Sequence, residues 1–164
     1  MSAVITLFVA DGQAMEALGR RLARSARRRG VIWLRGDLGT GKTTLVRGLL
    51  RGFGYQDKVR SPTYTLVEPY PLDGLNVYHL DLYRLGSPGE LEWLGIRDLS
   101  GEDALLLIEW PERGEGELPP ADLVIAIDYR DRGRELRLQP VTAQGERLMA
   151  ACLSPDPAVL LTDE

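Results

Sequence analysis

The amino-acid sequence predicts an α/β fold of three layers, in which helices cover a mixed sheet. Residues 31–34 and 105–108 form two short, wholly apolar runs, which are typical of parallel strands buried on both faces. Residues 71–74 read PLDG between two β-prone runs, and this turn sequence predicts an antiparallel hairpin. Because helical patterns alternate with the strand patterns along the chain, helices are expected on the faces of the sheet.

Length and composition fit one globular domain. The chain has 164 residues, of which 44% are hydrophobic and 27% are charged. This is about one domain's length, and we expect a domain over 1–153 with a frayed tail at 154–164. A net charge of −4 excludes a protein that binds nucleic acid with its whole surface. The single cysteine, Cys152, excludes an intramolecular disulfide and fits a reducing compartment. With no visible secretory signal or membrane-spanning run, the sequence predicts a cytoplasmic protein without membrane contact.

In the first half of the chain, strand and helix patterns alternate. Met15, Leu18 and Leu22 recur at helical spacing, and Gly30 stands where the end of that helix is expected. Gly52 ends the next helical pattern. The expected elements are a strand at 4–9, a helix at 12–29, a strand at 31–34 and a helix at 43–50.

In the second half, strand patterns predominate. Pro88 suits the first position of a short helix. Charged residues interrupted by glycines predict a loop at 112–117. The expected elements are strands at 64–70 and 75–82, a helix at 88–94, strands at 105–108, 123–127 and 135–138, and a closing helix at 142–153.

The turn after the first apolar run carries a phosphate-binding motif. Residues 36–43 read GDLGTGKT, which is the Walker A pattern in the strand–turn–helix setting it requires. Its glycines allow several backbone N–H groups to face a phosphate, and the helix N-terminus adds its positive dipole end. Lys42, expected on an exposed turn, supplies a charge to the outer phosphates, and the Thr43 hydroxyl can ligate Mg²⁺. The motif predicts a P-loop nucleoside triphosphatase fold. Its candidate nucleotide-binding residues are Asp37, Leu38, Gly39, Thr40, Gly41, Lys42, Thr43 and Thr44.

A carboxylate follows the second apolar run. P-loop enzymes need an acidic residue at the end of a neighbouring buried strand to hold Mg²⁺ or its water. Glu109 comes directly after the strand at 105–108 and is the candidate for this role beside Thr43. The alternative is a solvated carboxylate at a strand end.

A second acidic candidate lies on the expected strand at 75–82. Residues i and i+2 of a strand share a face, so His79 and Asp81 project together. Asp81 is a candidate for orienting water or a metal-bound water. The alternative is a polar strand face exposed to solvent.

Residues 61–65 read SPTYT and lie between the P-loop helix and the hairpin. Hydroxyl-bearing residues there can sense a γ-phosphate and reorder after hydrolysis, as switch loops do. Ser61, Thr63 and Thr65 are the candidate switch residues. An ordinary loop that leads into a strand is the alternative.

The sequence favours ATP over GTP. Guanine recognition uses an N-K-x-D segment, whereas Lys58 is followed by Val59 and Arg60 without that aspartate. Several arginines, Arg20, Arg24 and Arg27 or Arg28, share one face of the expected first helix. A solvated face is favoured, and contact with RNA phosphates or an acidic partner is the alternative.

Four segments together resemble one family of small bacterial ATPases, the TsaE (also called YjeE) family. The matching segments are GDLGTGKTT at 36–44, SPTYTLV at 61–67, HLDLYRL at 79–85 and LIEW at 107–110. Their order and spacing agree over roughly residues 4–150. The P-loop alone is shared by very many proteins, and the other three segments are far more specific.

The resemblance implies an ATPase required for threonylcarbamoyladenosine in tRNA. It implies work with TsaB and TsaD, the latter transferring the threonylcarbamoyl group to a tRNA adenosine, so that this chain meets tRNA only through the complex. It also implies Mg²⁺ held by Thr43 and Glu109, a switch-like loop at 61–65 and Trp110 near the nucleotide. Ala10 and Asp11 are implied near the adenine, close to Met15, where the family often has threonine.

These observations lead to one functional expectation and two rivals. We expect a Mg²⁺-dependent ATPase, weak alone and stimulated by its partners, with Lys42, Asp81 and Glu109 as catalytic residues. One rival is a small-molecule kinase, which needs an acceptor pocket and a lid with arginines; Arg130, Arg132 and Arg134 cluster late in the chain, in an expected hairpin turn. The other rival is an adaptor that senses ATP without hydrolysing it.

Overall fold

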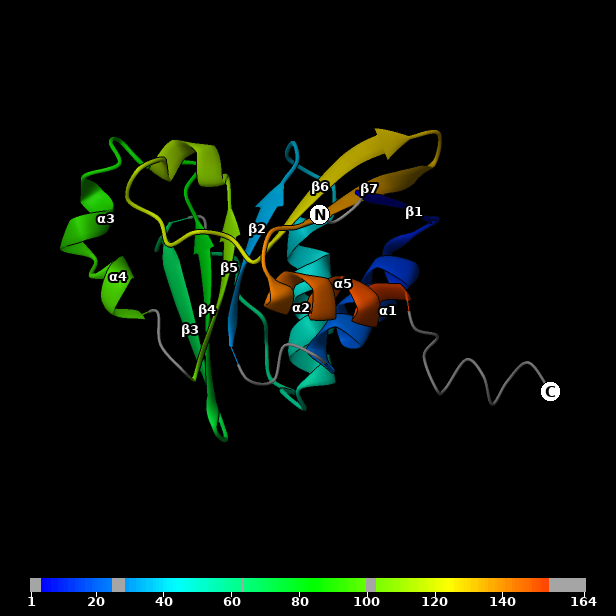
Figure 1. Ribbon diagram of the computed structural model, residues 1–164, viewed down its shortest axis with the longest axis horizontal. Coiled ribbons are helices and arrows are strands. Elements are labelled where there is room, and N and C mark those ends of the chain that lie inside the picture. Colours follow the sequence, from blue (N-terminus) through cyan, green and yellow to red (C-terminus); the bar gives the residue numbers. More distant parts are fainter. Residues whose placement is uncertain (1–3, 25–28, 63, 100–102, 154–164) are drawn as a thin grey trace.

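The computed structural model describes residues 4–24, 29–62, 64–99 and 103–153 (Figure 1). Within them lies one seven-stranded sheet with the order β1-β7-β6-β2-β5-β4-β3. The elements in chain order are β1 (Ile5–Val9), α1 (Gly12–Ala23), β2 (Gly30–Arg35), α2 (Lys42–Gly52), β3 (Val67–Leu72), β4 (Leu75–Asp81), α3 (Glu90–Trp93), α4 (Ile96–Leu99), β5 (Ala104–Glu109), the 3₁₀ helix η1 (Pro111–Gly114), β6 (Leu123–Arg130), β7 (Gly133–Pro140) and α5 (Ala143–Leu153).

The sheet is mixed, as predicted. β2 lies between β5 and β6 and is parallel to both, and β4 is parallel to β5. The remaining pairs, β3 with β4, β6 with β7 and β1 with β7, are antiparallel. The apolar runs predicted as buried strands are therefore the central pair, β2 and β5.

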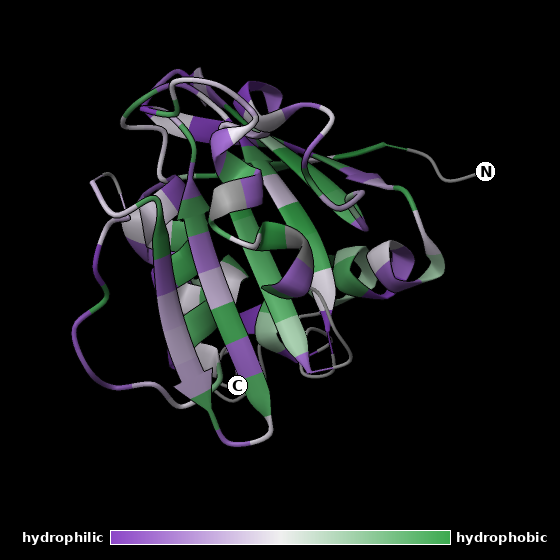
Figure 2. Ribbon diagram, turned by 90° about the vertical axis from the view of Figure 1, so that its left-hand side faces the viewer, coloured by the Kyte–Doolittle hydropathy of each residue, from purple (hydrophilic) through white to green (hydrophobic). Residues whose placement is uncertain are grey.

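The fold has three layers, because an apolar cluster lies on each face of the sheet. The side chains of the central strands point alternately into one cluster and the other. Leu105 and Leu107 of β5 pack with α1, α2 and α5 on one face of the sheet. Leu106 and Ile108 pack on the other face with Leu91 and Ile96, which belong to the small layer of α3 and α4. Figure 2 shows hydrophobic residues along much of the central strands. The predicted three-layer α/β fold is confirmed.

Several predicted boundaries are wrong. The first helix ends at Ala23 rather than near residue 29, and Gly30 is the first residue of β2, where it pairs with Leu105. The strand expected from residue 64 begins at Val67, because Leu66 adopts a left-handed conformation with φ +66°. The helix expected at 88–94 is shorter, and α4 follows it as a separate turn after Gly95.

Other expectations lie outside the described residues or need small changes. The expected tail at 154–164, Thr63, Arg27 and Arg28 belong to the part of the chain that the structure does not describe. The loop expected at 112–117 begins inside η1. Thr142 is not in the closing helix; its hydroxyl accepts a hydrogen bond from the Gly145 amide at the start of α5. Among the described residues, no helix combines the length and apolarity that crossing a bilayer requires.

Candidate functional site

Three parallel strands bring the candidate residues together at their carboxyl ends. β5 lies between β2 and β4, so the end of β2, where the P-loop begins, is beside Glu109. The register pairs Asp81 of β4 directly with Glu109 of β5. In open α/β sheets, ligands bind at this edge. Strand register thus joins segments that are more than 25 residues apart in the sequence.

The P-loop backbone has the shape that its glycines predict. Gly39 and Gly41 have φ of +81° and +108°, in the left-handed region that residues with a Cβ rarely adopt. Thr40 is buried, and its hydroxyl donates to the Asp37 carbonyl over 2.9 Å. No side chain caps the start of α2 at Gly41. The first N–H groups of the helix and its positive dipole end therefore suit an anion.

Lys42 is buried, so the expectation of an exposed turn is wrong. Lys42 is the first residue of α2, and only 5% of it is exposed. Its ammonium donates to the Gly36 carbonyl over 2.5 Å, lies 3.8 Å from Glu109 Oε1 and sits 4.2 Å from the centre of the Trp110 ring. Burial lowers the pKa of Lys42, although the negative charge of Glu109 opposes the change. The lysine is held beside the carboxylates by the fold itself.

Glu109 is also buried and has a defined partner. It is 4% exposed, and its Oε2 lies 2.5 Å from Nε2 of His79, which is fully buried. The alternative of a solvated carboxylate at a strand end is therefore wrong. The bond to His79 fixes the side chain of Glu109, so that Oε1 faces Lys42. Sequence reasoning placed His79 on the strand face with Asp81 and did not predict this bond, which depends on the pairing of β4 with β5.

Asp81 lies next to this pair, 7% exposed. A polar strand face exposed to solvent is thus excluded for His79 and Asp81. Asp81 Oδ1 accepts a hydrogen bond from the Tyr83 amide over 3.0 Å. Burial raises the pKa of Asp81, and the negative charge of Glu109 adds to this, while the bond from Tyr83 lowers it. Raised pKa values of this kind are typical of groups that handle protons or water.

We expect Asp81→Asn to raise the melting temperature by a few degrees at neutral pH. The folded protein holds the Asp81 proton more tightly than the unfolded chain does, so this carboxyl favours folding below its ordinary pKa of 3.8. That contribution is lost as the pH rises through the raised pKa. At neutral pH the buried carboxylate therefore costs stability, and an amide that keeps the bond from Tyr83 relieves the cost. Thermal melts between about pH 4 and pH 8 should show a gap that widens with pH.

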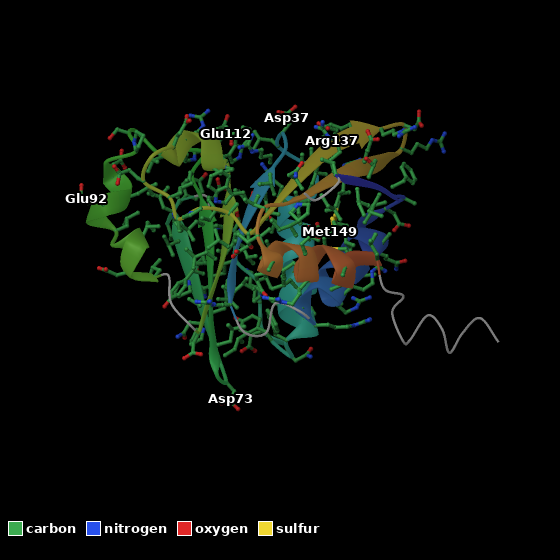
Figure 3. All side chains as sticks on the ribbon, in the orientation of Figure 1. Asp37, Asp73, Glu92, Glu112, Arg137 and Met149 are labelled. Carbon is green, nitrogen blue, oxygen red and sulfur yellow. The ribbon has the colours of Figure 1, made fainter. Side chains whose placement is uncertain are left out.

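Asp73→Asn is the matched control. Asp73 is exposed at the turn between β3 and β4, where Figure 3 shows it projecting from the end of the hairpin. Its replacement should leave the melting temperature unchanged. A wild-type protein as stable as Asp81→Asn at neutral pH would contradict the expected cost of the Asp81 charge.

A cleft of about 310 Å³ collects most of the predicted residues. The residues that line it are Leu38, Gly39, Gly41, Lys42, Thr43, Thr44, Ser61, Asp81 and Glu109. Thr43 and Glu109 thus face one space, as a shared Mg²⁺ requires. Among the described residues no three His, Cys, Asp or Glu side chains gather as a metal cluster. A cation in the cleft would meet the Thr43 hydroxyl, Glu109 and the oxygens of a phosphate, which are hard ligands of the kind that Mg²⁺ prefers.

A second pocket of about 300 Å³ adjoins the cleft. Gly39, Gly41 and Thr44 line both spaces. The other residues that line the second pocket are Ala10, Asp11, Gly12, Met15, Thr40, Arg132, Gly133 and Arg134. Ala10 and Asp11, which the family resemblance implies near the adenine, therefore line one pocket with Met15. The Asp11 carboxylate also accepts a bond from the Ala14 amide over 2.9 Å and caps α1.

Other predicted residues lie at the edge of the site or away from it. Ser61 lines the cleft, whereas the Thr65 hydroxyl bonds Glu68 over 3.3 Å at the surface. Asp37 is exposed and lines neither pocket; Figure 3 shows it at the outer tip of the loop. Trp110 contacts Lys42 and Tyr83 and has φ +57°, an uncommon conformation for a residue other than glycine.

Sequence reasoning missed the role of the β6–β7 hairpin. The sequence indicates Arg132 and Arg134 only as residues of a possible kinase lid, yet both line the second pocket. Tyr129 donates from its hydroxyl to the Leu38 carbonyl in the P-loop. No local motif marks these residues, because they reach the loop through the pairing of β6 and β7 with β2 and β1.

Comparisons with known proteins agree on one family. The family model described as "Threonylcarbamoyl adenosine biosynthesis protein TsaE" matches residues 9–136. The tRNA threonylcarbamoyladenosine biosynthesis protein TsaE of Haemophilus influenzae is 45% identical over 152 residues, which cover 90% of this chain and 96% of the relative. The Bacillus subtilis protein of the same name is 35% identical over 137 residues, 84% of each chain. The crystal structure of Bacillus subtilis YdiB superposes with a TM-score of 0.75 at 28% identity, covering 93% of this chain and 96% of that one.

Proposed function

The chain belongs to the TsaE family, and on this premise we propose that it is a Mg²⁺-dependent ATPase that serves threonylcarbamoyladenosine modification of tRNA. We propose that it acts in the cytoplasm with a TsaB–TsaD-like complex and meets tRNA only through that complex. One observation carries the ATPase part. Lys42 and Thr43 share a single cleft with two buried carboxylates, Asp81 and Glu109, which adjacent parallel strands hold side by side.

Each of these side chains has a role in the proposed reaction. Lys42 and the loop amides bind the outer phosphates, and Thr43 and Glu109 hold Mg²⁺. Bound Mg²⁺ neutralises charge on the phosphates. Asp81, whose pKa is raised, orients the attacking water. His79 keeps Glu109 in place through its bond to Oε2, so that the carboxylate is positioned before nucleotide arrives.

The segment at 61–65 is proposed as the nucleotide-dependent switch. Ser61 lines the cleft, so its hydroxyl is within reach of an outer phosphate. Leu66 follows it in a left-handed conformation, and its carbonyl accepts the Asp81 backbone N–H over 3.0 Å. A change in the segment would therefore be transmitted to the strand that carries Asp81. Such an ordering step upon γ-phosphate binding is a common way to signal nucleotide state to a partner.

The observations give less support to a small-molecule kinase. A kinase lid needs arginines free to close over the phosphates. Arg130 pairs with Glu135 over 2.9 Å, and Arg134 donates to two P-loop carbonyls. Two of the three arginines considered for a lid are thus engaged within the protein.

Reconstituted tRNA modification tests the proposal. We expect slow ATP turnover by the isolated protein and clear stimulation by a TsaB–TsaD-like complex, because a partner can order the switch segment or complete the catalytic site. Multiple-turnover threonylcarbamoylation of tRNA should require this protein. Thr63→Ala combined with Thr65→Ala should reduce the stimulation more than it reduces ATP binding.

Two results would count against the proposal. If the complex modifies tRNA equally well without this protein, the role in modification is wrong, although the ATP site can stand. If the protein binds ATP but does not hydrolyse it even with the complex and tRNA, the ATPase part is wrong and the sensing adaptor is favoured.

A further inference from the structure

We propose that Tyr129 and Arg134 are positioning residues that hold the P-loop in its phosphate-binding shape. From the β6–β7 hairpin they bond the carbonyl oxygens of three consecutive loop residues, 38–40. This inference rests on the proposed nucleotide binding and adds the device that orients the loop. We call Tyr129, Arg134 and their three bonds the carbonyl clamp.

The clamp consists of three hydrogen bonds and one stacking contact. The Tyr129 hydroxyl donates to the Leu38 carbonyl over 2.7 Å. Arg134 Nη2 donates to the Gly39 carbonyl over 3.3 Å, and its Nε donates to the Thr40 carbonyl over 3.1 Å. The Arg134 guanidinium lies 4.4 Å from the centre of the Tyr129 ring, so the two side chains support each other.

Peptide planarity converts these bonds into an orientation of the loop amides. In a trans peptide, the carbonyl of one residue and the N–H of the next point in opposite directions. Carbonyls held by the hairpin therefore fix the direction of the N–H groups of Gly39 and Gly41, and both glycines line the cleft and the second pocket, the spaces proposed for the nucleotide. The Thr40 N–H remains in the turn, where it donates to the Asp37 carbonyl over 3.3 Å.

A glycine-rich loop needs such an external constraint. Glycine reaches many backbone conformations, so the peptides around Gly39 and Gly41 can rotate at low cost. Each rotated peptide would present a carbonyl oxygen, rather than an N–H group, to a phosphate. If the loop is already fixed before binding, less conformational entropy of the loop is lost when a phosphate binds.

The hairpin can serve as this constraint because the sheet holds it in place. β7 pairs with both β6 and β1, and Arg134 is directly opposite Val9 at the end of β1. Two exposed ion pairs cross the same hairpin, Arg130 with Glu135 and Arg137 with Asp128. Of these three arginines, only Arg134 bonds the P-loop, and Arg130 therefore offers a matched control.

Two conservative variants test the clamp. Tyr129→Phe removes one hydroxyl and keeps the ring, and Arg134→Lys keeps the charge but cannot reach two carbonyls as the planar guanidinium does. From the strength of ordinary hydrogen bonds, we expect Tyr129→Phe to weaken ADP binding by about 3–10-fold and Arg134→Lys by about 5–50-fold. Arg130→Lys should bind ADP as the wild type does. Melting of the nucleotide-free protein should change little.

Hydrogen exchange distinguishes the clamp from direct contact with ADP. In the nucleotide-free protein, both clamp variants should exchange the Thr40 amide, which bonds the Asp37 carbonyl, faster than the wild type, while Arg130→Lys should not. Unchanged exchange at the Thr40 amide overturns the clamp, since a residue that touches only the nucleotide cannot affect the loop before binding. Wild-type ADP affinity in both variants overturns it as well. A wild-type protein that fails to bind ADP would instead refute the proposed function.

Discussion

Lys42→Met should weaken ATP binding by about 10-fold to 100-fold while leaving the protein folded. Lys42 supplies the side-chain cation of the P-loop cleft, and a hydrogen bond to a charged group is worth about 1.5–3 kcal/mol. Methionine keeps most of the length and apolar volume of the buried side chain. Burial lowers the pKa of Lys42, so the folded protein disfavours the charged lysine and its removal costs little stability. Calorimetric titration with ATP beside a thermal melt measures both effects.

The chain provides its own control for this experiment. Lys58 is the only other lysine in the sequence and lies exposed in the loop after α2. Lys58→Met removes the same charge from the protein and should leave ATP affinity and melting unchanged. Wild-type ATP affinity in Lys42→Met would refute the assignment of residues 36–43 as a phosphate-binding loop.

Features that depend on local sequence were predictable. The P-loop is one continuous segment, and the spacing of its glycines, lysine and threonine is enough to predict its backbone shape. The central strands were predicted from wholly apolar runs, because a strand covered by helices on both faces carries apolar side chains on both. These two apolar runs, with the turn sequence between β3 and β4, were enough to predict the mixed α/β class.

Features that depend on strand register were predicted only in part. Glu109 and Asp81 were each recognised by their place in a strand, but their direct pairing comes from the parallel alignment of β4 with β5. Their burial and the bond from His79 to Glu109 follow from that alignment. A sequence pattern indicates on which face of the sheet a side chain lies. It does not indicate which residue of the neighbouring strand is paired with it.

The carbonyl clamp is the feature of the site that the sequence alone predicts least. Arg134 is separated by 94 residues from Thr40, the P-loop residue whose carbonyl it bonds through Nε. The sequence contains arginines on both sides of it in the same hairpin, and no local feature distinguishes the one that reaches the loop.

Glu109→Gln should reduce ATP hydrolysis by at least about 10²-fold and weaken ATP binding only modestly. Glutamine has the same size and can still bond His79, so the site should keep its shape. The variant lacks the negative charge that the proposed Mg²⁺ site requires, and loss of a comparable electrostatic or acid–base group typically costs 10²-fold or more. Single-turnover hydrolysis with saturating ATP and Mg²⁺ separates the chemical step from binding.

Glu112→Gln is the control for charge. Glu112 lies in η1, three residues after Glu109, and its negative charge also acts on Lys42, but the side chain is exposed (Figure 3). Removing this charge should leave hydrolysis within about twofold of the wild-type rate, because an exposed charge is strongly screened by solvent. If Glu109→Gln hydrolyses ATP at the wild-type rate, Glu109 does not hold the metal. Asp81, the buried carboxylate next to it, then becomes the residue to test, and Asp81→Asn should show the loss of hydrolysis that Glu109→Gln did not.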